Sequence, residues 1–139
     1  MRVTQVSAFL ENRPGRLLHL LNVLAEAKVN VLAHDIVDAS DFGIAHLVVD
    51  DPKLAVAAIS SAGLTATITS VLVVDVPNEP GAFVNYVLRP LAEAGVNIQY
   101  SYAFAAQAGA GANKPVRSSR VVLKVDDAAK AERALAGAG

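Results

Sequence analysis

The sequence predicts an α+β protein built from two ferredoxin-like βαββαβ units, each an antiparallel sheet with its helices on one face. Two repeated motifs lead to this prediction. Asn-Arg-Pro-Gly at residues 12–15 returns as Asn-Glu-Pro-Gly at residues 78–81. Leu-Ala-Glu-Ala-Lys-Val-Asn-Val at residues 24–31 returns as Leu-Ala-Glu-Ala-Gly-Val-Asn-Ile at residues 91–98. The motifs recur after 66 and 67 positions in the same order, which indicates an internal duplication with one extra residue in the second copy.

The first copy begins with a strand and a helix. Residues 3–10 are a β-rich run that ends at the turn formers of residues 11–15. Leucines then recur at helical spacing from Leu17 to Leu24, which predicts a helix.

A hairpin, a second helix and a fourth strand complete this copy. Residues 29–37 and 42–49 are apolar runs on either side of a short turn, which predicts a hairpin. Pro52 suits the first turn of a helix that stops at Gly63, and residues 64–69 follow as a strand.

The second copy repeats this order almost completely. It comprises a strand at residues 71–76, a helix at 81–94, strands at 96–104 and 120–125, and a helix at 127–136. No fourth strand is visible, so the second sheet must lack that edge, borrow one, or be a truncated copy. The extra residue falls in the helix near Pro90, where a π-bulge or a kink would absorb it.

The two copies define domains at residues 1–70 and 71–139. Residues 68–71 join them without glycine or proline. A single bent strand over residues 64–76 is therefore expected, shared by both units.

Composition excludes several classes of function. Of the 139 residues 53% are hydrophobic, and 12 basic residues against 13 acidic ones give a net charge of −1, so we expect neither nucleic acid nor an acidic membrane surface as a partner. No apolar run approaches the roughly 20 residues of a membrane span. The chain has no cysteine and enters a strand without a signal-peptide core, which predicts a cytoplasmic protein without disulfides.

The two Pro-Gly loops are the candidate ligand sites. Gly15 and Gly81 lack a Cβ, so a ligand can approach the free amides at the start of the following helix. The partial positive charge there would hold the carboxylate of an amino acid, while Asn12 and Asn78 would complement its ammonium group. The alternative, which stays open, is that these residues only form a turn and a helix start.

The two loops are not chemically equivalent. Arg13 is replaced by Glu79 and Arg16 by Ala82, so one of the sites is a candidate for degeneration. Asn30 and Asn97 precede the second strand of each copy, where asparagine favours a helix-to-strand turn, with an interface role as the alternative.

The remaining polar residues give weaker hypotheses. His19, His34 and His46 could form a metal site if the hairpin brought the last two together, but polar satisfaction or interface packing is favoured, and we predict no metal and no cofactor. Residues 105–119 replace the short turn of the first hairpin with an Ala- and Gly-rich loop. A surface excursion is favoured there, with a basic lid formed by Lys114, Arg117 and Arg120 as the alternative.

The repeated motifs resemble those of ACT domains, in the tandem form of stand-alone amino-acid-binding ACT proteins. The resemblance rests on the two Pro-Gly loops, the two Ala-Glu-Ala-x-Val-Asn passages, and Ser-Asp-Phe-Gly at residues 40–43. It implies a regulatory module whose effector site forms at a domain interface, from the loop before the first helix and the second strand of a neighbouring copy. The ligand-binding candidates are Asn12, Arg13, Pro14, Gly15, Arg16, Asn30, Asn78, Glu79, Gly81, Ala82 and Asn97.

The sequence therefore favours a regulatory protein that binds a free amino acid between ACT units or protomers. A homo-oligomer is expected, with a dimer favoured, and a metabolic enzyme is a further candidate partner. The alternative is a ligand-free interaction module that regulates a partner enzyme in trans. Catalysis is not expected, since no catalytic carboxylate pair, triad or cofactor loop is visible.

Overall fold

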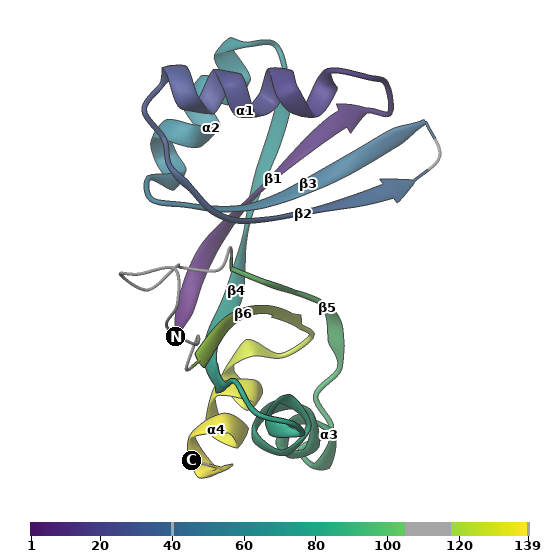
Figure 1. Cartoon of the computed structure of the whole chain (residues 1–139), viewed down its shortest axis with the longest axis vertical. Helices are drawn as coiled ribbons and strands as arrows, with labels where there is room; N and C mark the ends of the chain where they lie inside the picture. Colours follow the sequence, from purple (N-terminus) through teal and green to yellow (C-terminus); the bar gives the residue numbers. More distant parts are fainter. Residues whose placement is uncertain (40, 105–117, 139) are drawn as a thin grey trace. The chain divides into compact units, whose positions relative to one another are not determined.

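The computed structural model describes residues 1–39, 41–104 and 118–138, and the fold is α+β (Figure 1). Its elements, in chain order, are β1 (Arg2–Glu11), α1 (Arg16–Glu26), β2 (Val31–Ala39), β3 (Phe42–Val49), α2 (Pro52–Ser61), β4 (Thr65–Pro77), η1 (Val84–Leu88), α3 (Arg89–Glu93), β5 (Ile98–Ala103), β6 (Ser118–Val125) and α4 (Ala128–Ala138). The strands are hydrogen-bonded in the order β2-β3-β1-β4-β6-β5.

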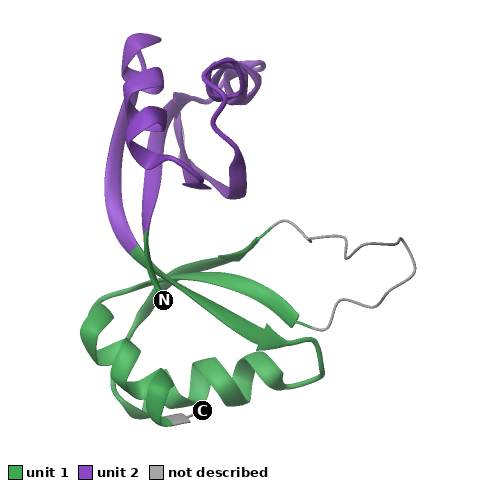
Figure 2. Ribbon diagram, turned by 90° about the vertical axis from the view of Figure 1, so that its left-hand side faces the viewer, with its two compact units in different colours: residues 1–3, 71–139 green, residues 4–70 purple. Residues whose placement is uncertain are grey.

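The chain forms two compact units (Figure 2). Unit 2 consists of residues 4–70, and unit 1 consists of residues 1–3 and 71–139. Strands β1 and β4 contribute residues to both units.

Unit 2 has the strand order β2-β3-β1-β4, with α1 and α2 on one face of its sheet, which is the ferredoxin-like arrangement (Figure 1). β1 pairs antiparallel with β3, with Val6 opposite Leu47, and β2 pairs antiparallel with β3. In β1 and β3 the alternate residues that face the helices are apolar. The buried core contains Val6, Leu10, Leu20, Leu24, Leu47, Val49, Ala55 and Ile59.

Unit 1 places its core residues at matching positions. Its core contains Leu72, Val76, Val87, Leu91, Leu123, Val125 and Ala131. These residues correspond to Val6, Leu10, Leu20, Leu24, Leu47, Val49 and Ala55 of unit 2, at a spacing of 66 positions in the first strand, 67 in the first helix, and 76 after the longer connection of the second hairpin. Both units therefore bury the same side of the same elements.

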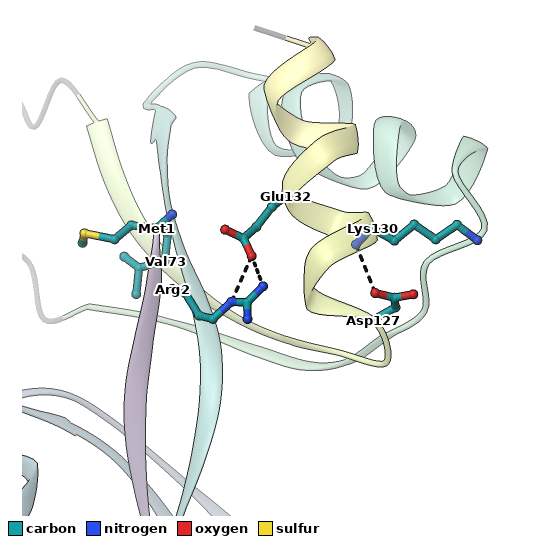
Figure 3. A network of polar contacts seen from close by, with 6 residues as sticks. All are labelled: Met1, Arg2, Val73, Asp127, Lys130 and Glu132. Carbon is teal, nitrogen blue, oxygen red and sulfur yellow. Dashed lines mark hydrogen bonds and ion pairs between the residues drawn. The ribbon is translucent and has the colours of Figure 1, made fainter.

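The fourth strand of unit 1 comes from the beginning of the chain. Met1 and Val73 exchange both backbone hydrogen bonds, at 2.8 and 3.1 Å, as residues directly opposite each other in an antiparallel pair do (Figure 3). Arg2, the next residue along, forms an ion pair with Glu132 of α4. In the described residues no strand follows α4, and residues 1–3 occupy the position of the fourth strand in unit 1.

The junction between the copies is a single strand. β4 runs without interruption from Thr65 to Pro77, which confirms the shared strand that the absence of glycine and proline predicts. Its first six residues belong to unit 2 and the rest to unit 1.

The extra residue of the second copy forms a π-helical turn. η1 covers Val84–Leu88, and the N–H of Arg89 bonds to the carbonyl of Val84, five residues earlier. Pro90 follows and has no N–H to donate. The insertion is absorbed so that Val87 and Leu91 both remain in the core.

The strands after the first helices begin later than the sequence predicts. β2 begins at Val31 and β5 at Ile98, because the chain first turns through a left-handed residue, Lys28 with φ 62° and Gly95 with φ 75°. The turns are closed by matching backbone bonds of 2.9 Å, from Val29 to Leu24 and from Val96 to Leu91.

These two turns give a prediction about stability. The Cβ of lysine is disfavoured in the left-handed region by about 1 kcal/mol, so Lys28→Gly should raise the free energy of unfolding by about that amount. Gly95→Lys should lower it by a similar amount, because an added Cβ would meet nothing closer than the Lys130 Nζ at 3.5 Å and only the backbone would be strained. Urea unfolding followed by circular dichroism measures both changes, and effects of the same sign would contradict this account.

Candidate functional site

The two Pro-Gly loops have the same backbone geometry. In unit 2, Arg13 N–H bonds to the Glu11 carbonyl at 2.9 Å, and His19 N–H bonds to the Gly15 carbonyl at 2.9 Å. In unit 1 the matching bonds run from Glu79 to Pro77 at 3.0 Å and from Asn85 to Gly81 at 2.9 Å. Gly15 and Gly81 have φ values of 85° and 78°, in the left-handed region that favours glycine. Each loop thus delivers the chain into its helix in the same way.

The start of α1 differs from the starts of α2 and α4. Asp51 accepts a hydrogen bond from the N–H of Leu54 at 3.1 Å, and Asp127 accepts one from Lys130 at 3.0 Å (Figure 3). These two helices therefore carry their own carboxylate caps. The N-cap of α1 is Gly15, which provides no side-chain cap, and the first turn holds no acidic residue. A carboxylate from outside could take the place that aspartate fills in the other two helices.

Charged residues surround the loop of unit 2. Glu11 forms ion pairs with Arg13 at 2.7 Å and with Arg16 at 3.3 Å. The Nδ2 of Asn12 donates to the Asp38 carboxylate at 2.9 Å, and its backbone N–H donates to the Asp41 carbonyl at 2.9 Å. The loop is thereby held against the β2–β3 turn. Sequence reasoning did not select Glu11 or Asp38, whose proximity depends on the hairpin register.

The loop of unit 1 has a different charge. Pro77, Glu79 and Ala82 stand where unit 2 has Glu11, Arg13 and Arg16. Residues 11–16 therefore carry one net positive charge and residues 77–82 one net negative charge. Residues 105–117 of the Ala- and Gly-rich segment, which include Lys114 and Arg117 of the basic-lid alternative, lie outside the described residues. Arg120, at its end, pairs with Asp75 at 3.0 Å and lies 5.6 Å from the centre of the Phe104 ring.

Asn30 and Asn97 do not lie beside the Pro-Gly loops of their own units. Each follows the first helix at its far end, and α1 alone is 11 residues, or about 16 Å, long. The N–H of Asn30 donates to the Asp50 carboxylate at 2.9 Å, and that of Asn97 donates to Asp126 at 3.0 Å. This is the helix-to-strand turn that the sequence favours.

The histidines do not gather. His34 lies opposite Leu47 and His46 lies opposite Asp35, so His34 and His46 are on opposite faces of the sheet. The hypothesis that the hairpin makes them near neighbours is wrong, because His46 is one residue away from Leu47, the residue opposite His34, and neighbouring residues of a strand lie on opposite faces. In the described parts of the chain, no group of three or more potential metal-ligating side chains is present.

A buried polar cluster lies on the face of unit 2 opposite the helices. Gln5 is 0% exposed, and its Nε2 lies 3.1 Å from the Nδ1 of His46, while Ser7 Oγ lies 3.1 Å from the same atom. The Gln5 amide and the Ser7 hydroxyl thus both lie within hydrogen-bond distance of one ring nitrogen. Burial lowers the pKa of His46, and the Asp35 carboxylate opposes this by raising it.

Unit 1 builds the same positions from valine. At the spacings of the repeat, Val71, Val73 and Val122 correspond to Gln5, Ser7 and His46, and all three valines are buried. The polar cluster is therefore not required for a unit of this fold. Sequence reasoning missed it, although the alternation of Gln5 and Ser7 with Val6 and Ala8 signals a strand with one polar face.

The fold and the repeated loops define a tandem pair of βαββαβ domains. The sequence matches the ACT domain pair family over residues 1–134, and the chain belongs to this family.

Solved structures share the fold. The chain is similar to protein BT0572 from Bacteroides thetaiotaomicron, with 34% identity and a TM-score of 0.86, over 99% of this chain and 88% of that chain. It is similar in fold to the regulatory subunit of aspartate kinase from Thermus thermophilus in its ligand-free form, with 17% identity and a TM-score of 0.67, over 96% of this chain and 88% of that chain. It is also similar in fold to the regulatory subunit of aspartate kinase from Thermus flavus, with 18% identity and a TM-score of 0.66, over 99% of this chain and 93% of that chain. No curated protein matches the sequence.

The His46 cluster gives a prediction about pH. Because the pKa of His46 is lowered in the folded state, the unfolded chain binds more protons below the ordinary value of 6.5. Stability should therefore fall as the pH falls below 6.5, until the pH reaches the lowered pKa. The combined change of Gln5, Ser7 and His46 to valine, the residues of unit 1, should remove this part of the pH dependence. Urea unfolding at several pH values measures it, and an unchanged pH dependence in the variant would contradict the assignment.

Proposed function

We propose that this protein is a regulatory sensor that binds a free amino acid at its Pro-Gly loops. It acts without catalysis, as a cytoplasmic homo-oligomer with a dimer favoured, and a metabolic enzyme is the candidate partner that responds to it. Membership of the ACT domain pair family supports a regulatory role. In the described residues, no helix is long and apolar enough to span a membrane.

The observation that carries the proposal is the uncapped start of α1. The chain caps α2 and α4 with aspartate but begins α1 with a left-handed glycine and no acid in the first turn. A bound amino acid would supply the missing carboxylate to these amides. An added Cβ at Gly15 would have no atom within 4 Å, so the space in front of the helix is open.

Charge favours the loop of unit 2 over that of unit 1. Arg13 and Arg16 share the single carboxylate of Glu11 and leave a net positive charge that attracts an anionic group. The Asp38 carboxylate, which accepts a hydrogen bond from Asn12 of the loop, suits the ligand's ammonium group. In unit 1, Glu79 would oppose the ligand's carboxylate. We therefore expect the first loop to bind more tightly.

Binding regulates only if the ligand prefers one arrangement of the protein over another. A difference of about 1 to 3 kcal/mol in binding free energy is sufficient for a useful switch. The Glu11 ion pairs provide a local change, because a carboxylate ligand would compete with Glu11 for the two arginines.

A thermal-shift screen against the twenty amino acids tests the proposal. A ligand at about 100 times its dissociation constant adds about 2.7 kcal/mol of stability, which is a rise of several degrees in Tm for a chain of this size. We expect a shift with one amino acid or one chemical group of them, lost in Gly15→Val, whose side chain would fill the ligand's space.

Gly63→Val is the matched control. Gly63 has φ +79° and open space around its Cβ, as Gly15 does, but it lies at the end of α2. Gly63→Val should lower the Tm of the free protein about as much as Gly15→Val does, and it should keep the rise in Tm caused by the ligand. Gly81→Val should keep most of that rise. A shift that persists in Gly15→Val would exclude the first loop, and no shift with any amino acid would favour a ligand-free interaction module.

A further inference from the structure

The two units differ at one matched pair of positions beside the fourth strand. In unit 1, Arg2 of the fourth strand pairs with Glu132 of α4 (Figure 3). The Met1–Val73 pairing places Arg2 opposite Leu72. β1 and β4 are neighbours, and the same register places Ile68 opposite Val6, the counterpart of Leu72. Ile68 thus takes the position of Arg2.

The partner of Arg2 is replaced as well. Asp51 and Asp127 cap α2 and α4 in the same way. Val56 lies five residues after Asp51, and Glu132 lies five residues after Asp127, so Val56 is the counterpart of Glu132. Where unit 1 has an ion pair, unit 2 therefore has an isoleucine and a valine.

A groove lies at this place in unit 2. Its volume is about 730 Å³, and its lining includes Pro52 and Val56 of α2, and Ala66 and Ile68 of β4. Ile68 is 63% exposed, although it is a large apolar residue on a sheet. The rim carries both signs of charge, from Asp50, Asp51 and Lys53.

The neighbouring strand edge has none of the usual protection against pairing. Residues 65–70 are Thr-Ala-Thr-Ile-Thr-Ser, with no charge, proline or glycine. Val73 bonds to Met1, so odd-numbered residues of β4 face β1, and Ala66, Ile68 and Ser70 direct their backbone groups outward. β6 pairs only with Leu72 to Pro77. Proteins usually protect such edges with charged side chains, and this chain does so at the matched position of unit 1 only.

We propose that the groove and the edge formed by residues 65–70 are the surface through which two copies of this chain associate. The two strands would pair antiparallel about a two-fold axis, with Thr67 opposite the partner's Thr67 and Ile68 opposite the partner's Ala66. This register is self-complementary, because a large side chain meets a small one twice and threonine meets threonine. The mixed charges of the two rims do not repel as two rims of one sign would.

This surface would belong to the homo-oligomer of the proposed function, and the homo-oligomer is the one part of the proposed function on which it rests. It does not depend on the identity of the ligand. A variant that no longer associates can still be screened for an amino-acid thermal shift, so failure of one proposal is distinguishable from failure of the other.

The first experiment transfers the protection of unit 1 to unit 2. The double variant Val56→Glu, Ile68→Arg reproduces the pair that unit 1 accommodates, so it should fold. In sedimentation velocity over a wide range of protein concentrations, the wild type should reach the mass of two chains. The double variant should keep the mass of one chain. Leu18→Arg, at a position that is 73% exposed on α1 and outside the groove, should associate like the wild type. A wild type that is monomeric throughout, or a double variant that associates normally, would overturn the inference.

The second experiment tests the register. The chain has no cysteine, so a single introduced thiol can bond only to the partner's. Directly opposite residues at this type of position have Cα atoms about 4.5 Å apart, within the range of a disulfide. Thr67→Cys should form a covalent dimer under mild oxidation, and Thr65→Cys, which would lie opposite the partner's Thr69, should not. Absence of the Thr67→Cys dimer, or equal cross-linking at both positions, would exclude this pairing.

Discussion

The pairing of β1 with β4 is the constraint on which the rest of the fold depends. A ferredoxin-like unit needs four strands, and two separate units would need eight, but the described chain has six. β1 and β4 each serve both units, so the hydrogen bonds between Met1 and Val73 complete the sheet of unit 1, and residues 65–70 complete that of unit 2. The backbone groups that these two strands direct toward each other are thereby paired, with six described strands in place of eight.

Duplication preserved the backbone and the core, while the polar side chains diverged. The loop bonds after β1 and β4, the closing bonds at Val29 and Val96, and the aspartate caps recur at the spacings of the repeat. The differences lie in the loop charges, in the Gln5–Ser7–His46 cluster and in the Arg2–Glu132 pair. A buried polar cluster contributes less to stability than packed valines unless every hydrogen bond is made. The Gln5–Ser7–His46 cluster is present in unit 2 alone, so any role that it has is not shared by unit 1.

Sequence reasoning recovered the element order and the shared strand, because these follow from periodicity and from residues 68–71. The one-residue difference in spacing left a π-bulge and a kink as alternatives, and the structure has the π-helical turn. It could not identify what filled the missing strand position, since Met1–Val3 carries no mark of the contact with Val73, 72 residues away. It placed His34 and His46 together because distance from a turn does not fix the face on which a side chain lies. The Glu11 and Asp38 contacts of the first loop depend on tertiary register, which local patterns do not contain.

The shared strands also affect how the protein folds during synthesis. Unit 2 is one continuous stretch, residues 4–70, and it can form as soon as that stretch has left the ribosome. Unit 1 needs the first three residues of the chain together with the last half. Residues 1–3 can therefore find their place only after residues 71–73 have been made, later than unit 2 can form. The contacts of unit 1 thus join segments that are far apart in the sequence, and unit 1 is expected to form more slowly than unit 2.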